Sequence, residues 1–251
     1  MKKKSKQKSH GTTRKKIEGI PSGNPEDFVR RCDDLINLCE IINDQNETNQ
    51  QLLKNFIKIR LVSIVEFNLK GFVSELIDIQ NLNPKDILDK NSIEIDLDVL
   101  QNFENVPYTK GKIVVAHLDK MNPGIVYTIM NNINKLDTFK WIDKILNKDS
   151  GTCFKFFKAL YMDRNDLTHN LTDTFETTKT LSTNIRIMRN MIFALFICTH
   201  CNIDMLHKKL PESIIEREYG STLKKLQMNQ NKFKDITLKF KKEYKPFKKK
   251  Y

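Results

Sequence analysis

The fold is decided by residues 50–80, which read QQLLKNFIKIRLVSIVEFNLKGFVSELIDIQ. Apolar residues recur in this stretch at the spacing of one face of an α-helix; they are Leu53, Ile57, Ile64, Val65, Phe72, Leu76 and Ile79. This apolar face is wider than a helix on a protein surface needs. We therefore predict a long, centrally packed helix over residues 50–80, which ends before Asn83-Pro84 because proline disfavours a helical residue in front of it.

One carboxylate of this stretch, Glu66, lies between Val65 and Phe67 and therefore close to the apolar face. A position at the solvated edge of the helix is one interpretation. A carboxylate that points into a functional site is the other, because a charge near a core needs a partner.

Helical patterns flank the central stretch on both sides. Asn24-Pro25-Glu26-Asp27 has a capping residue, a proline at the first helical position and two acids near the positive end of the helix dipole, and apolar residues follow at helical spacing up to Ile42. After a polar break at 43–49 and the central helix, the sequence predicts further helices over residues 122–146 with a break near Leu136, 152–171 and 175–208.

Residues 85–122 fit the helical pattern least well. Residues 93–99 alternate between apolar and acidic side chains as a strand does, and the apolar run 112–116 could pair with them. We therefore predict an all-α fold with a small β-hairpin insertion at about 85–122. The expected organisation is a basic disordered arm over residues 1–23, a helical domain over 24–210 that contains the insertion, and a basic helical extension over 211–251.

Composition limits the class of protein. Gly and Pro number only 8 and 7 in 251 residues, which argues against a turn-rich β architecture. The five cysteines are odd in number and widely scattered, which indicates a reducing compartment. The basic N-terminus is followed by no apolar stretch, and the most apolar run, 191–198, is too short to span a bilayer. We therefore expect a cytoplasmic protein without a membrane partner.

Charge points to a polyanionic partner. Lys and Arg outnumber Asp and Glu by 43 to 31, for a formal net charge of +12, and binding to phosphates would release counterions. The lysines gather in residues 1–16 and 221–251, where aromatic side chains alternate with them in the second segment. The first segment is either a nucleic-acid-tethering arm or a solubilising tail. The aromatic residues either stack on bases or pack one face of an amphipathic helix.

The residues that could carry chemistry are Arg164-Asn165-Asp166-Leu167-Thr168-His169, where an apolar helix runs into polar side chains. Asn165 and His169 are four positions apart and stack on one helical face. Arg164 is roughly 140° around an ideal helix from His169, and it reaches the same site only by its long side chain or if the helix loosens. The alternative is that Arg164 and Asn165 bond backbone groups at a helix end and His169 is merely exposed.

The order Arg, polar residue, three residues, His resembles the signature of HEPN domains, and the resemblance covers about residues 25–208. Two positions depart from the usual pattern, because Thr168 stands where a small residue is usual and Asn170 where glycine is frequent. The resemblance implies a HEPN-like bundle of four or five helices, with the motif at the end of the third main helix and another long helix after it. The sequence looks closest to prokaryotic HEPN proteins of defence and toxin systems.

The same resemblance implies metal-independent RNA cleavage without a cofactor. His169 would be the acid or base, Arg164 would hold the scissile phosphate, and Asn165 would orient His169 or the phosphate. It also implies a homodimer in which two motifs face each other, and an antitoxin or defence-system partner. Some HEPN domains bind nucleic acids, nucleotides or partners without cleaving, and a regulatory protein of this kind is the alternative. A helical scaffold whose tails bind acidic partners is a third class.

A second cluster, Cys198-Thr199-His200-Cys201, has the residue types of zinc ligands. A tetrahedral zinc site needs a second ligand pair, and Cys32 and Cys39 have the wrong spacing for a knuckle. Cys198 lies in an apolar helical stretch, so core packing is the favoured interpretation and no metal is expected.

Overall fold

The computed structural model describes residues 24–79, 109–116, 118, 121–134, 137–169, 176–206 and 220–228. Within these ranges the chain is helical and forms no strand, which confirms the all-α class. The helices are α2 (Pro25–Ile42), α3 (Glu47–Ile79), α6 (Lys110–Ala116), α7 (Pro123–Asn134), α8 (Thr138–Ile145), α9 (Thr152–His169) and α10 (Thr178–Leu206). Residues 220–225 form a further short helix.

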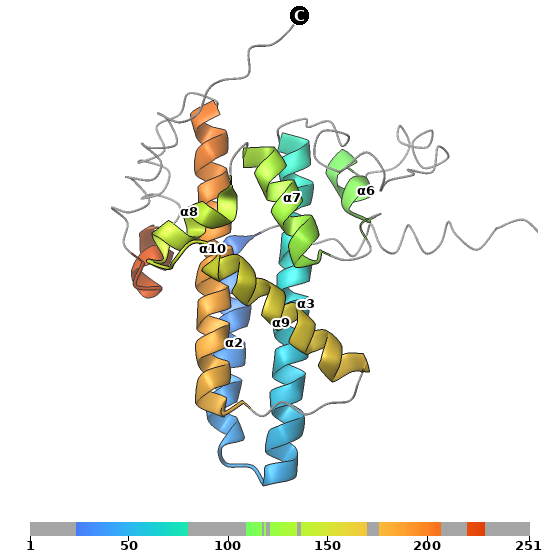
Figure 1. The fold of residues 1–251 in the computed structure, drawn as a ribbon, viewed down its shortest axis with the longest axis vertical. Coiled ribbons are helices and arrows are strands. Elements are labelled where there is room, and N and C mark those ends of the chain that lie inside the picture. The colour runs from blue at the N-terminus through green and yellow to red at the C-terminus, as the bar shows by residue number, and fades with distance from the viewer. Residues whose placement is uncertain are drawn as a thin grey trace, which may run out of the picture.

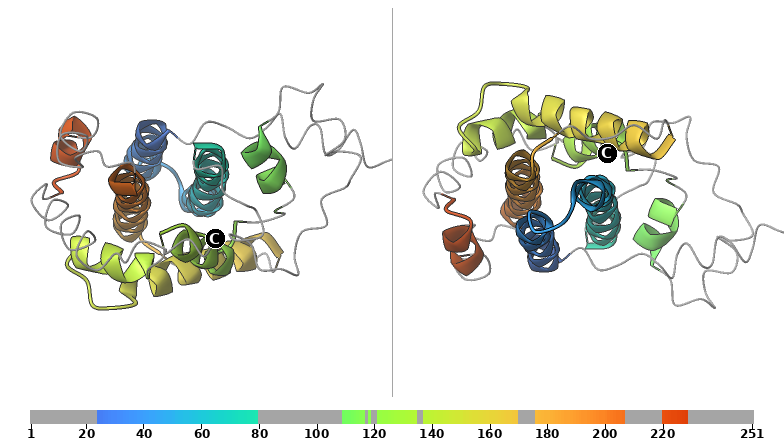
Figure 2. Two further views of the ribbon diagram at one scale, coloured as in Figure 1. Left: turned by 90° about the horizontal axis from the view of Figure 1, so that it is seen from above. Right: turned by 90° about the horizontal axis from the view of Figure 1, so that it is seen from below.

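Helices α2, α3 and α10 lie side by side with nearly parallel axes, and the other helices pack around them (Figure 1). Seen along these axes, α7, α8 and α9 form a second layer on one face of the long helices, and α6 lies beside α3 (Figure 2). Helix α9 crosses α3 obliquely, so its C-terminal end extends past α3 (Figure 1). This crossing determines which residues of α3 can meet the motif.

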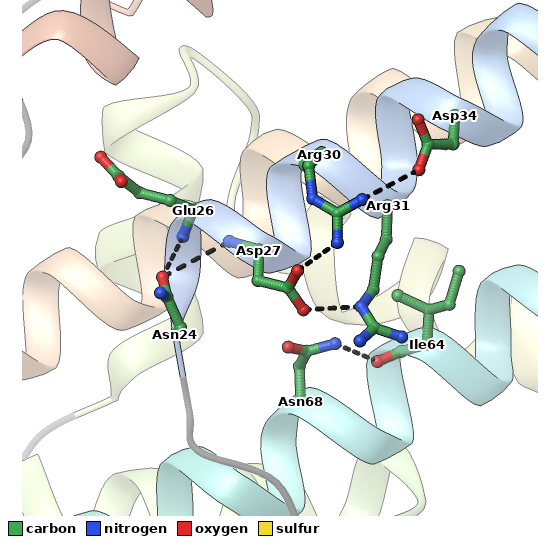
Figure 3. Close-up of polar contacts among 8 residues, drawn as sticks. All are labelled: Asn24, Glu26, Asp27, Arg30, Arg31, Asp34, Ile64 and Asn68. Carbon is green, nitrogen blue, oxygen red and sulfur yellow. Dashed lines mark hydrogen bonds and ion pairs between the residues drawn. The ribbon is translucent and has the colours of Figure 1, made fainter.

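Helix α2 begins where local signals predict it. The Asn24 side chain accepts hydrogen bonds from the backbone N–H groups of Glu26 (2.8 Å) and Asp27 (3.4 Å), and Pro25 occupies the first helical position. Asp27 in turn accepts hydrogen bonds from Arg30 (2.5 Å) and Arg31 (2.6 Å), and these bonds hold the pKa of its carboxyl below the ordinary value (Figure 3). The predicted start of this helix is confirmed.

Helix α3 is the central helix that the apolar pattern predicts. It starts at Glu47, three residues before the expected start, and is buried along most of its length. Helices α2, α6, α9 and α10 all pack against it. Its Phe72 ring lies 4.2 Å from the Phe196 ring of α10, centroid to centroid, deep in the core.

The β-hairpin prediction is wrong for residues 112–116, which lie in helix α6. The run is apolar because it packs against α3, and a short buried run has the same composition in a helix as in a strand. Its proposed partner, residues 93–99, lies outside the described residues. The other helices follow the prediction closely: the break near Leu136 separates α7 from α8, and α9 ends at His169 in the described part.

Helix α10 begins at Thr178, three residues later than the predicted residue 175. The Thr177 hydroxyl, just before it, accepts a hydrogen bond from the backbone N–H of Thr180 (3.1 Å). Its segment Thr178–His200 has the length and composition of a membrane-crossing helix, longer than the run 191–198 that the sequence singled out. In an 18-residue stretch of this segment that is apolar enough to cross a membrane, 67% is buried inside the protein, as in a core helix.

Helix α6 can approach α3 only because residue 111 is glycine. The backbone N–H of Gly111 donates a hydrogen bond to Asp78 Oδ1 of α3 (2.7 Å), and a Cβ atom built on Gly111 would overlap the backbone carbonyl oxygen of Ser74. Since that carbonyl belongs to the central helix, it cannot move aside without disturbing α3. A glycine at this position is therefore a packing requirement.

Replacing Gly111 by alanine is expected to lower the free energy of unfolding by about 2 kcal/mol, the cost of forcing extra volume into a packed contact. The measurement is urea denaturation followed by circular dichroism. Gly124→Ala is the matched control, because a Cβ at that helical glycine meets its nearest atom, Asn122 Oδ1, at 3.4 Å. Equal stability of the Gly111→Ala variant and the wild type would contradict the close approach of α6 to α3.

Candidate functional site

The motif helix α9 is fixed at its start by a buried aspartate of α8. Asp143, 1% exposed, accepts hydrogen bonds from the backbone N–H groups of Gly151 (2.6 Å) and Cys153 (2.8 Å). Gly151 has a φ of +85°, a left-handed conformation that favours glycine. Two backbone N–H groups at the helix start, which the helix itself leaves without partners, thus donate to a carboxylate of a neighbouring helix. This contact sets the direction of α9.

The middle of α9 is held by a lysine of α3. Lys58 Nζ lies 2.8 Å from Asp163 Oδ2 of α9 and 2.9 Å from Glu176 Oε1, just before α10, and the Lys58 side chain is only 5% exposed. Burial lowers the pKa of Lys58, but the two carboxylates outweigh it and raise that pKa above the ordinary 10.5. The motif therefore lies between two residues, Asp163 and Glu176, that are both bound to Lys58 of α3.

Arg164 turns inward, toward α3. Its side chain is 20% exposed, and its Nη2 atom lies 3.8 Å from Oε2 of Glu66, whose side chain is 18% exposed. Its Nη1 atom donates a hydrogen bond to Asn165 Oδ1 (3.1 Å). Of the two interpretations of Glu66, the structure supports the carboxylate that points at the candidate site.

Glu66 also lies beside Tyr161, one turn before Arg164. Burial, as the main cause, and the Glu66 carboxylate, as the second, raise the pKa of the Tyr161 phenol far above its ordinary value. The phenol donates a hydrogen bond to the Met121 carbonyl (2.7 Å). The phenol therefore stays neutral, and its hydrogen bond to the residue Met121 holds α9 in place next to the motif.

Two buried atoms of the Glu66–Arg164 pair have no hydrogen-bond partner within the described part of the chain: Arg164 Nε and Glu66 Oε1. An unpaired buried polar group costs about 1–3 kcal/mol. Folded proteins contain few such groups, and a functional role is one of the recognised reasons for keeping them. The pair is therefore poorly satisfied, and an anion that accepts hydrogen bonds could compete with Glu66 for the guanidinium.

The other two motif residues face solvent. Helix α9 continues without a break to His169, so Asn165 and His169 lie one turn apart on its exposed outer side. Arg164 lies on the inner side, and within the described residues no hydrogen bond joins it to His169. The structure thus brings Arg164 to Asn165, and Asn165 to the face of His169, but does not bring Arg164 and His169 together.

Sequence reasoning missed Lys58 and its pairing with Asp163. The available signal was the spacing of Lys58, three and four positions before Leu61 and Val62 on the apolar face of the helix, because a lysine in such a place needs a carboxylate partner. Asp163 lies 105 positions after Lys58 in the chain, and the two meet only because α3 and α9 cross.

The first three residues of the cysteine cluster, 198–200, pack against or within the core. Cys198 is buried, Thr199 is fully buried and donates to the Leu195 carbonyl (2.9 Å), and the His200 ring packs 5.2 Å from the Phe72 ring. No group of three potential metal-ligating side chains gathers anywhere in the described ranges. The core-packing interpretation of Cys198 is confirmed.

Comparison with known proteins adds no further constraint on the family. The chain matches no protein-family model, and no curated protein or solved structure is significantly similar to it.

Proposed function

We propose that this protein is a metal-independent endoribonuclease of the HEPN type, whose site lies at the C-terminal end of α9. The observation that carries the proposal is the arrangement of the motif: Asn165 and His169 are presented to solvent one turn apart, and Asn165 is hydrogen-bonded to an incompletely satisfied Arg164. An exposed histidine beside an amide and a guanidinium provides a proton carrier and an anion clamp.

The chemistry would be a transesterification. His169 would take the proton of the ribose 2′-hydroxyl or give one to the leaving 5′-oxygen, since histidine exchanges protons near neutral pH. The 2′-oxygen attacks phosphorus while the bond to the 5′-oxygen breaks, which leaves a 2′,3′-cyclic phosphate and a 5′-hydroxyl. Arg164 would stabilise the negative charge that builds up on the phosphoryl oxygens.

One protomer supplies only part of such a site, because Arg164 faces α3 while His169 faces outward. Two copies that meet at the C-terminal ends of their α9 helices about a two-fold axis would place two histidines and two Asn165–Arg164 pairs around one phosphate. Glu66 would neutralise Arg164 until the phosphate arrives. We therefore propose a homodimer that acts on RNA in the cytoplasm, as a toxin or defence effector that an antitoxin or another defence component controls.

A second candidate function is a catalytically silent HEPN protein that binds nucleic acid or regulates a partner. A specific observation favours it: the guanidinium of Arg164 is already engaged by Glu66 and Asn165 and is not directed at His169. The two candidates differ in whether RNA is broken.

The proposed enzyme is expected to cleave labelled RNA in the presence of EDTA and to leave 2′,3′-cyclic phosphate ends or their hydrolysed form. The measurement is gel electrophoresis of the products with analysis of their termini. An RNA with a 2′-deoxy sugar at the cleaved position is the matched control and should stay intact. Cleavage that stops in EDTA and returns with Mg²⁺ would contradict the mechanism, and RNA that is bound but never cut would favour the silent protein.

A further inference from the structure

We infer that the outer face of α9 is a binding track for single-stranded RNA, in which Lys155 and Lys158 hold phosphates beside the candidate site. The name α9 track refers below to Lys155, Lys158, Met162, Asn165 and His169. The inference rests on the proposed function for the identity of the polyanion, and it adds the residues that would position the strand.

The α9 track is one continuous face. Its five members are all exposed and follow one another at intervals of three or four positions, with Phe157, Leu160 and Tyr161 buried on the opposite side. From Lys155 to His169 the face is about 21 Å long, at 1.5 Å per residue. The helices that contact α9, which are α3, α7 and α8, pack on its inner side (Figures 1 and 2).

The α9 track carries two positive charges that no other described residue neutralises. Lys58, Arg164 and Arg189 all have carboxylate partners. The ammonium groups of Lys155 and Lys158 are exposed and have no ion-pair or hydrogen-bond partner within the described ranges. Of the two acids of α9, Asp163 is already bound to Lys58, and Asp166 is exposed between Asn165 and His169, two turns beyond Lys158. A phosphate backbone would supply the missing counter-charge.

Met162 favours an unpaired strand over a duplex. Its side chain is 56% exposed, between Lys158 and Asn165, although a large apolar side chain gains nothing in water. A flexible, polarisable thioether packs well against flat or irregular apolar surfaces. The faces of bases are available for such a contact only where they are unstacked, as in single-stranded RNA.

Binding can be measured apart from cleavage in the full-length His169→Ala protein, with a fluorescent single-stranded RNA and anisotropy at several salt concentrations. Adding Lys155→Gln and Lys158→Gln is expected to weaken binding about 10-fold. It should also reduce the slope of log K against log salt by about 1.4, since each phosphate contact to a single strand contributes about 0.7. Adding Lys140→Gln and Lys148→Gln instead removes the same charge from exposed positions outside α9 and should change neither quantity comparably.

Equal affinities and salt slopes in the two double-lysine variants would overturn the track, whether both bind as tightly as the parent or both bind equally weakly. Thermal unfolding checks that both variants are folded. The proposed function fails separately: if the wild type cuts no RNA but binding still depends on Lys155 and Lys158, the track stands and the nuclease does not. If the wild type cuts RNA and the Lys155→Gln/Lys158→Gln form cuts it with the same KM, the track fails and the nuclease stands.

Discussion

His169→Ala is expected to lower the rate of RNA cleavage by about 10²–10⁴-fold, the usual contribution of a general acid or base. The free energy of unfolding should hardly change, because the His169 side chain is exposed at the end of the described part of α9. Single-turnover cleavage and urea denaturation measure the two quantities on the same preparation. A large loss of rate in a variant with unchanged stability would assign a chemical role to His169.

Thr168→Ala is the matched control for this experiment. Among the described residues, the Thr168 hydroxyl donates only to backbone carbonyls of its own helix, those of Arg164 (2.9 Å) and Asn165 (3.1 Å), so its loss should leave the cleavage rate close to that of the wild type. Wild-type cleavage by the His169→Ala variant would show that the chemistry lies elsewhere.

The His169→Ala variant also tests whether two protomers share one site. Arg164→Ala and His169→Ala protomers are each expected to be inactive as homodimers. A mixture in which subunits exchange should regain some activity if one phosphate is held by residues of both protomers. If each protomer carries its own site, the mixture stays as inactive as its components.

The sequence predicted a helix correctly where its start or its buried face depends only on residues close together in the chain. The Asn24-Pro25 start of α2 depends on a side chain two positions from the N–H group that it caps, and the apolar face of α3 depends on periodicity alone. Helix α6 was mispredicted because its apolar run is too short to show a period. Its conformation is determined by the contact of Gly111 with α3, a tertiary effect that no local pattern contains.

The candidate site shows the same division between local and tertiary information. The spacing of Asn165 and His169 was enough to place both on one face of a helix. The side on which Arg164 lies followed from the 3.6-residue period only once the helix was known to be unbroken to His169. The role of Glu66 stayed open between two interpretations, because the partner that decides it lies on another helix.

Lys58→Ala is expected to lower the free energy of unfolding by about 3 kcal/mol, which is near the lower end for breaking a buried ion pair. The lower end applies because Asp163 is 46% exposed and can regain water, whereas Glu176 is 24% exposed and less able to do so. Lys54→Ala is the matched control, because Lys54 donates one hydrogen bond to the Glu176 carbonyl (3.3 Å), which is worth about 1 kcal/mol. Urea denaturation at neutral pH measures both variants.

The pH dependence of this difference tests its electrostatic origin. Because the folded-state pKa of Lys58 is raised above 10.5, its contribution to stability is fully present below pH 10.5 and is lost as the pH rises through the folded-state value. The wild type should therefore lose stability in alkaline solution faster than Lys58→Ala, and the two should converge. A constant difference between them up to the highest pH at which both stay folded would mean that Lys58 acts through the packing of its methylene groups. In that case the two carboxylates would not be what fixes the motif helix to α3.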